Sequence, residues 1–201
     1  MTRGAEDVLR FWLDETGPDG WYGGGEALDR EVAERFGPAL EAAADGALSL
    51  WLTYPSGALA YCILTDQFPR NMFRGQARAF ATDGLALGAA MAAVRKGWDR
   101  RIDPPARQFF YLPFMHAECP RHQDRAVRLI ADRLPQEAGG ASNLLHARAH
   151  RDVIRRFGRF PYRNEALGRE TTEAEARWTA DGGYGATVRA LGGEDDEEDA
   201  A

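Results

Sequence analysis

The sequence predicts an all-α protein built from about eight helices that pack antiparallel to their neighbours. Apolar residues recur at spacings of three and four in nearly every segment, which is the periodicity of helices with one buried face. Strict alternation of apolar and polar residues over the length of a strand is absent. The connections between the periodic segments are short, so consecutive helices are expected to run in opposite directions beside each other.

The expected helices follow one another along the chain to about residue 180. Glycine and proline clusters separate the apolar stripes and mark where one helix ends and the next begins. In chain order they are a short helix with Val8, Leu9 and Trp12, a helix with Leu28, Val32 and Phe36 that is followed by an Ala-rich stretch to Asp45 as its continuation, Ser56–Gln67, Thr82–Gly97, a segment opened by Pro104-Pro105, Pro120–Leu134, Ala141–Phe157 and Thr172–Ala180.

Local signals define several element ends in the first half of the chain. The glycines between Gly17 and Gly25 predict a loop after the first helix. Gly37-Pro38 predicts a break or kink in the second helix, because proline lacks the N–H that a helix interior needs. Thr82 or Asp83 is expected to be the N-cap of the helix that follows.

The second half carries the clearer helix patterns. Pro104-Pro105 is expected to open a helix, since the first turn leaves its N–H groups unbonded in any case. Between Pro120 and Leu134, apolar residues occupy one side and charged residues the other, which predicts an amphipathic helix. Thr172 and Glu175 form a Thr-x-x-Glu capping box, which predicts a helix start at that point.

The domain organisation follows from length and charge. A chain of 201 residues is about the size that a single core serves, so we expect one helical domain over residues 1–185. Six acidic residues between Glu194 and Asp199 equal the entire net charge of -6. Residues 181–201 also hold five glycines, so we expect the end of the chain to be frayed, with a flexible acidic tail over 186–201.

Charge and composition exclude several classes of function. Outside the acidic end, 25 basic residues balance the acidic ones, so the excess of basic residues that nucleic-acid binding requires is missing. The longest mostly apolar run, Leu85–Val94, is about half of the roughly 20 residues that a membrane helix needs. Cys62 and Cys119 are the only cysteines, which argues against a disulfide framework. We therefore expect a soluble cytoplasmic protein with neither a nucleic-acid nor a membrane partner.

Segment 141–157 places polar groups on a helix face that should be buried. At about 100° per residue, His146, His150 and Arg156 fall in the same arc as the apolar residues of this segment. A buried guanidinium needs an acceptor or an anion, and buried imidazoles need hydrogen-bond partners. The histidines also have the i, i+4 spacing of metal ligands, but arginines flank them and no acidic residue lies between them. We expect neither a metal nor a cofactor.

A second polar cluster lies between residues 66 and 74. Asp66 continues an apolar helical stripe and therefore needs a cationic or donor partner. Pro69 bends the chain where Arg70, Asn71 and Arg74 follow. These arginines, together with Arg156 and Arg159, outnumber nearby acids such as Asp66 and Glu118, which indicates an anion site. The alternative is a turn in which Asp66 and Arg70 simply hold each other.

Four long motifs resemble a bacterial family known as domain of unknown function 924. The resemblance spans about residues 6 to 182. In this sequence the motifs are Leu64-Thr65-Asp66-Gln67-Phe68-Pro69-Arg70-Asn71, Arg78-Ala79-Phe80-Ala81-Thr82-Asp83, Tyr111-Leu112-Pro113-Phe114-Met115-His116-Ala117-Glu118 and the segment from His150 to Asn164. The resemblance implies an all-helical fold with tetratricopeptide-like helix pairs, but it implies no activity.

The resemblance also ranks the candidate residues. It implies that His116, His150, Asp66 and Arg156 belong to the family signature, whereas His122 and His146 do not. Thr65 departs from the usual apolar residue of the family. Tyr162 replaces a frequent histidine, which weakens any site that needs a third imidazole near His150.

Two functions remain open from the sequence. In the first, paired helices form a scaffold that binds an anionic small ligand or an acidic peptide. In the second, the protein is an enzyme of hydrolase or transferase type that acts on an anionic substrate through general acid–base catalysis. The first is favoured because helical-repeat folds more often bind than catalyse. The candidate catalytic residues are His116, His150 and Asp66, and the candidate ligand-binding residues are Arg70, Asn71, Arg74, Glu118, Asp152, Arg156 and Arg159.

Overall fold

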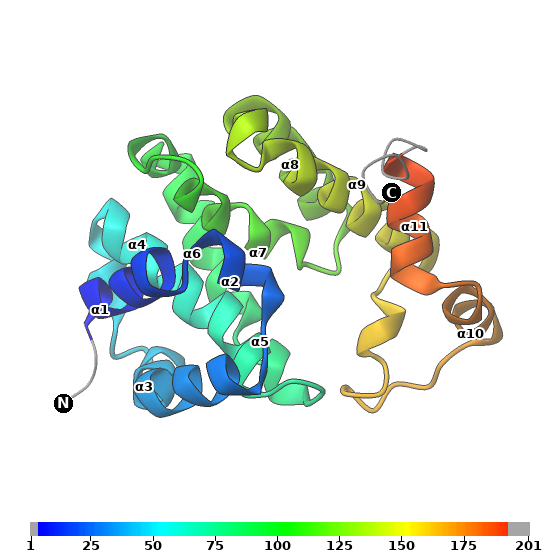
Figure 1. The fold of residues 1–201 in the computed structure, drawn as a ribbon, viewed down its shortest axis with the longest axis horizontal. Coiled ribbons are helices and arrows are strands. Elements are labelled where there is room, and N and C mark those ends of the chain that lie inside the picture. The colour runs from blue at the N-terminus through cyan, green and yellow to red at the C-terminus, as the bar shows by residue number, and fades with distance from the viewer. Residues whose placement is uncertain (1–3, 193–201) are drawn as a thin grey trace. The chain divides into compact units, whose positions relative to one another are not determined.

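A computed structural model describes residues 4–192, and its ribbon is shown in Figure 1. This part of the chain is helical and contains no strand, which confirms the predicted all-α class. Among the described residues, none of the helices is both long and apolar enough to span a membrane. The described residues divide into two compact units, with the boundary between Pro113 and Phe114. The prediction of one domain over residues 1–185 stays a prediction.

The N-terminal unit contains helices joined by tight helical turns. Its α-helices are α1 (Ala5–Leu9), α2 (Gly17–Gly23), α3 (Glu26–Ala44), α4 (Pro55–Cys62), α5 (Phe68–Met72), α6 (Asp83–Arg95) and the start of α7 (Leu112–Met115). Its 3₁₀ turns are Ser49–Thr53, Ala77–Phe80, Trp98–Arg101 and Ala106–Phe110, and its π-helical turns are Arg10–Thr16 and Ile63–Gln67.

An aromatic cluster forms the core of this unit. The ring centroid of Phe36 in α3 lies 5.1 Å from that of Phe11 and 4.8 Å from that of Phe68. Trp12 packs edge-on against Phe68 at 5.4 Å. Each of these side chains is at least 98% buried, and buried aromatic rings of this size dominate the stability of a core. The cluster fixes α3 against α5 and against the turn after α1.

Three predicted details of this unit are wrong. The glycine-rich segment after the first helix forms α2 over much of its length, with Trp21 buried. Of the break or kink expected at Gly37-Pro38, the break is absent, because α3 continues to Ala44 with its Phe36 and Leu40 packed in the core. The kink stays a prediction. The segment opened by Pro104-Pro105 is a 3₁₀ turn followed by the short α7.

Thr82 occupies the predicted N-cap position of α6, but its side chain makes a different bond. Its hydroxyl donates to the carbonyl oxygen of Thr65 at 2.6 Å instead of accepting from the first turn of α6. The structure therefore uses this hydroxyl to join the start of α6 to the π-helical turn that contains Asp66. A π-helical turn leaves backbone carbonyls out of the regular pattern, so such a partner is useful there.

The C-terminal unit consists of two longer helices followed by two shorter ones. They are α8 (Pro120–Arg133), α9 (Gly140–Phe157), α10 (Glu173–Ala180) and α11 (Gly183–Gly192), with 3₁₀ turns at Gln136–Ala138 and Pro161–Arg163. Helices α8 and α9 lie side by side, and α11 packs against α9 (Figure 1). The amphipathic helix predicted from Pro120 is confirmed, as is the capping box of Thr172 and Glu175 at the start of α10.

The frayed end expected from residue 181 onward is wrong for residues 183–192, which form α11. Gly182 and Gly183 both have positive φ angles, of 96° and 54°, and they turn the chain between α10 and α11. The rest of the predicted acidic tail, residues 193–201, lies outside the described residues. Because of α11, Tyr184 joins the core cluster of Val153, Ile154, Phe160 and Trp178.

Candidate functional site

Arg70 is held by two carboxylates of the N-terminal unit. Its guanidinium forms a two-pronged pair with Asp83, in which Nη1 lies 3.0 Å from Oδ1 and Nη2 3.1 Å from Oδ2. Nη1 also lies 3.5 Å from Oδ1 of Asp66 and donates to the backbone carbonyl of that residue. Asp66 is buried, and its other oxygen accepts from Nε2 of Gln67 at 2.5 Å. Asp66 and Arg70 therefore hold each other within the protein. This is the alternative to an anion site that the sequence left open.

Arg74 and Asn71 share a single acidic partner, Asp29 of α3. Nε and Nη2 of Arg74 lie 3.0 and 2.9 Å from the two carboxylate oxygens, and Nδ2 of Asn71 lies 2.9 Å from one of them. Burial acts to raise the pKa of Asp29, but the hydrogen bonds from Arg74 and Asn71 outweigh it, so the pKa is lowered. The local excess of arginines seen in the sequence is thus offset by an acid 45 residues away in the chain.

Arg156 does not lie on the buried face of α9, so that prediction is wrong. Its side chain is exposed, and its guanidinium carbon lies 4.9 Å from the centroid of the Phe157 ring. The buried side of α9 includes Asn143 and Ala147, which shifts its centre away from Arg156. Asp152 is exposed as well. These two candidate ligand-binding residues lie at the surface of the C-terminal unit.

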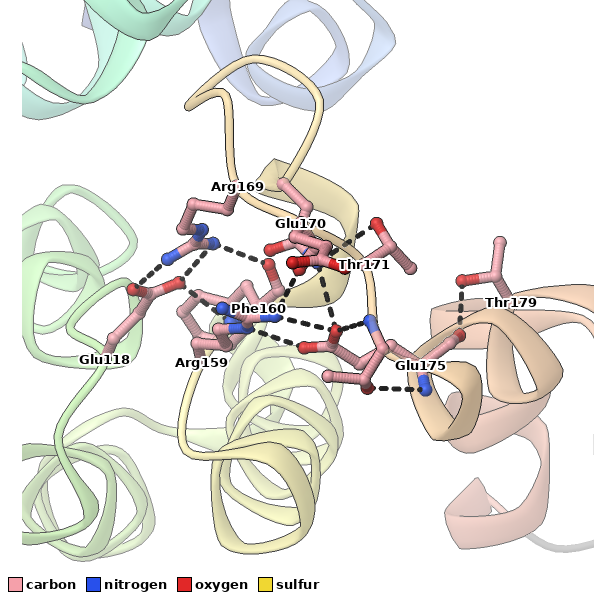
Figure 2. A network of polar contacts seen from close by, with 10 residues as sticks. Glu118, Arg159, Phe160, Arg169, Glu170, Thr171, Glu175 and Thr179 are labelled. Atoms are coloured by element: carbon pink, nitrogen blue, oxygen red, sulfur yellow. Dashed lines mark hydrogen bonds and ion pairs between the residues drawn. The ribbon is translucent and has the colours of Figure 1, made fainter.

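Arg159, just after α9, is paired with a buried glutamate. Its Nε and Nη2 lie 2.6 and 2.8 Å from the two carboxylate oxygens of Glu175, as Figure 2 shows. Glu175 also accepts from the backbone N–H of Thr172 at 2.8 Å. The hydrogen bonds from Arg159 lower the pKa of Glu175 from 4.5 to about 2, although burial opposes this, and those from Thr172 add to the effect.

Glu118 holds the loop between α9 and α10. Its carboxylate pairs with Arg169 through bonds of 2.7 and 3.0 Å and accepts the backbone N–H of Phe160 at 2.7 Å (Figure 2). Burial acts to raise the pKa of Glu118, but the bonds from Arg169 and Phe160 outweigh it, so the pKa is lowered. The carboxylate that the sequence offered for ligand binding thus makes three bonds inside the C-terminal unit.

The remaining candidates, His116 and His150, come together in this unit. Their ring centroids are 6.1 Å apart, although they lie in different sequence motifs. The hydroxyl of Tyr184 lies 2.8 Å from Nδ1 of both His146 and His150. Nδ1 of His150 also lies 2.8 Å from the backbone carbonyl oxygen of His146, one turn earlier in α9. We call His116, His146, His150 and Tyr184 the histidine cluster.

Aromatic and cationic groups surround the histidine cluster. The ring of Phe160 packs edge-on against His150 at 5.3 Å and is stacked on Tyr162 at 5.2 Å. The guanidinium carbon of Arg163 lies 4.7 Å from the centroid of the Phe160 ring, and Nη2 of Arg163 donates to the carbonyl oxygen of His116 at 3.0 Å. Arg163 is buried, so its positive charge is close to the cluster and poorly screened by water.

The environment keeps the α9 histidines neutral. Burial lowers the pKa of His150 from 6.5 to about 3, and the charges of His116 and Arg163 act in the same direction. Burial also lowers the pKa of His146 and raises that of Tyr184, to which Tyr162 adds. Within residues 4–192, no group of three or more His, Cys, Asp or Glu side chains is placed to hold a metal ion.

Sequence reasoning identified part of this cluster and missed the rest. Helical projection selected His146 and His150 equally, whereas the resemblance set His146 aside, and the structure places both on Tyr184. Tyr184 was not a candidate, because it lies in the segment that was expected to be frayed. The signal that could have found it is the apolar spacing of Tyr184, Val188 and Leu191, which follows the glycine pair and has helical periodicity.

The fold and these polar contacts define an all-helical protein with histidines gathered in its C-terminal unit. The chain belongs to a family described as bacterial proteins of unknown function, DUF924, which matches residues 8–183. It is similar to a protein of unknown function from Agrobacterium tumefaciens with a solved structure, at 43% identity and a TM-score of 0.81, over 88% of this chain and 97% of that chain. No curated protein matches the chain.

Proposed function

We propose that the protein binds a small anionic ligand at the histidine cluster of its C-terminal unit. The observation that carries this proposal is the meeting of His116 and His150, whose ring centroids are 6.1 Å apart. The buried Arg163 adds a positive charge beside them. Positive charge and directional hydrogen-bonding groups in a partly buried place are what a small anion requires.

The proposed site does not include the arginines that first suggested an anion site in the sequence. Arg70 and Arg74 belong to the N-terminal unit, where Asp83 and Asp29 neutralise them. Arg159 is neutralised by Glu175. A guanidinium that already forms a two-pronged pair has little left to offer an anion, because the pair would first have to break.

Binding is favoured over catalysis by the state of His150. A general base works best when its pKa lies near the working pH, and a pKa of about 3 makes this imidazole a weak base. A neutral imidazole that is held by Tyr184 and by a backbone carbonyl is well suited to a fixed hydrogen bond with a ligand. The enzymatic alternative would need a ligand that raises the pKa of His150 substantially.

The test is a titration of the full chain with inorganic phosphate, observed through the imidazole C–H signals in NMR spectra. The signals of His116 and His150 should move at millimolar phosphate, whereas sodium chloride at matched ionic strength should leave them unchanged. The variant His116→Gln should weaken the effect. His122→Gln is the matched control, since His122 packs on Phe114 and is not part of the cluster.

Two results would count against the proposal. If phosphate, sulfate and small carboxylates move these signals no more than chloride does, the cluster does not bind small anions. If an acidic peptide moves them where every small anion fails, the protein is a peptide-binding scaffold, and the small-ligand proposal is wrong.

A further inference from the structure

The hydrogen bonds of His150 determine which of its nitrogens carries the proton. A backbone carbonyl oxygen can only accept, and the one of His146 lies 2.8 Å from Nδ1 of His150. A bare Nδ1 would place two lone pairs against each other at that distance. Nδ1 of His150 is therefore the protonated nitrogen, and in the neutral ring Nε2 carries a lone pair.

The contacts of Tyr184 agree with this assignment. Nδ1 of His150 lies 2.8 Å from both the His146 carbonyl oxygen and the tyrosine hydroxyl oxygen, so its N–H can be shared between these two acceptors. The tyrosine O–H is then free to donate to Nδ1 of His146 at 2.8 Å. Each close contact contains one proton, and no two donors or two acceptors face each other.

Nε2 of His150 makes no hydrogen bond with any of residues 4–192, since all the hydrogen bonds of this ring are made at Nδ1. The side chain is partly exposed, so the atom belongs to a ring that a ligand can approach. The proposed site thus combines a hydrogen-bond acceptor with the positive charge of Arg163, since His150 and Arg163 both pack on the ring of Phe160. An anion without any hydrogen would place its own lone pairs against this acceptor.

We infer that the ligand of the histidine cluster is an oxyanion that carries a proton of its own, of which hydrogen phosphate is the simplest, and that its O–H donates to Nε2 of His150. This inference rests on the proposed function, because it specifies the anion bound at the same site. Such a ligand satisfies the acceptor with its O–H and the positive charge of Arg163 with its charged oxygens. Sulfate has a similar size and charge but has no hydrogen to donate near neutral pH, so the site should reject it.

The test compares phosphate with sulfate on the full chain. Calorimetric titrations at pH 7 and equal ionic strength should give an affinity for phosphate at least about tenfold higher than for sulfate, which corresponds to one well-placed hydrogen bond. Equal affinities would overturn the inference while leaving anion binding intact. Binding of neither ion would overturn the inference, and if small carboxylates also fail to bind, the proposed function is overturned as well.

Two further measurements keep the inference separate from a general loss of binding. Long-range proton–nitrogen NMR spectra should show a protonated Nδ1 and an unprotonated Nε2 for His150, and the opposite assignment would overturn the inference whatever the affinities. In His150→Gln, the amide can rotate to donate to sulfate. The ratio of the phosphate affinity to the sulfate affinity should therefore fall toward one. The control His122→Gln should keep it. A His150→Gln protein that is folded by circular dichroism and still prefers phosphate tenfold would contradict the role of His150.

Discussion

The hydroxyl of Tyr184 lies 2.8 Å from Nδ1 of His150, and this contact joins the first turn of α11 to the middle of α9. A second bond has a similar effect, because Nε1 of Trp178 in α10 donates to the hydroxyl of Thr187 in α11 at 3.2 Å. Helix α11 is therefore bound to both α9 and α10. Removal of α11 should therefore lower the free energy of unfolding of the protein.

A chain that ends at Gly182 should be less stable than the full chain by about 1.5 to 3 kcal/mol, the value of burying one large apolar side chain such as Tyr184. For a protein of this size, the melting temperature should fall by about 3 to 12 °C. A chain that ends at Gly192 should melt within about 2 °C of the full chain, because residues 193–201 include no apolar residue larger than Ala. Thermal unfolding followed by circular dichroism measures both. Equal losses in the two chains would show that α11 contributes nothing of its own.

The sequence was sufficient to predict the helical class, the amphipathic α8 and the capping box of α10, because each depends on residues within a few positions of one another. It was not sufficient where packing outweighs local preference. Pro38 is tolerated inside α3 because Phe36 and Leu40 pack on either side of it. Likewise, the glycines at 182 and 183 indicated a loose end, although they form the turn that allows α11 to pack on α9.

Arg156→Met should change the free energy of unfolding by no more than about 1 kcal/mol, since only the contact with the Phe157 ring is lost. Arg169→Met should cost about 1.5 to 3 kcal/mol, because it leaves the half-buried carboxylate of Glu118 without its two-pronged partner. Denaturant unfolding at pH 7 gives the free energy of unfolding of both Arg→Met variants, and the difference between them is the quantity to compare. A larger loss for Arg156→Met would mean that its guanidinium has an internal partner after all.

The pairing of arginines is the part of the candidate site that the sequence could not provide. Arg169 and its partner Glu118 are 51 residues apart, and Arg74 and its partner Asp29 are 45 residues apart. No spacing rule connects such residues, so Arg70, Arg74 and Arg159 were counted as an excess although each already has an acidic partner. The histidines of α9 were recognised because their relationship is local, one helical turn apart.

Two kinds of group make the folded state sensitive to acid, in different pH ranges. His150 binds a proton less readily in the folded chain, so its contribution is complete above pH 6.5 and is lost as the pH falls from there toward 3. Glu175 also has a lowered pKa, and its contribution is lost only as the pH falls from about 4.5 toward 2. Between pH 6.5 and 5 the loss should therefore come mainly from histidine.

Lowering the pH from 6.5 to 5 should destabilise the protein by up to about 2 kcal/mol through His150 alone, since each pH unit below the unfolded pKa costs at most about 1.4 kcal/mol per group. The melting temperature should fall by about 4 to 8 °C over this range.

His150→Gln cannot take up the proton, so most of this fall should disappear in that variant. His122→Gln should retain most of it, because the pKa of His122 is lowered by burial and by Arg121 and Arg125 outside the cluster and His150 remains in place. Melting curves at half-unit pH steps give the slope for each protein. An unchanged slope in His150→Gln would show that His150 is already able to take up a proton in the folded protein.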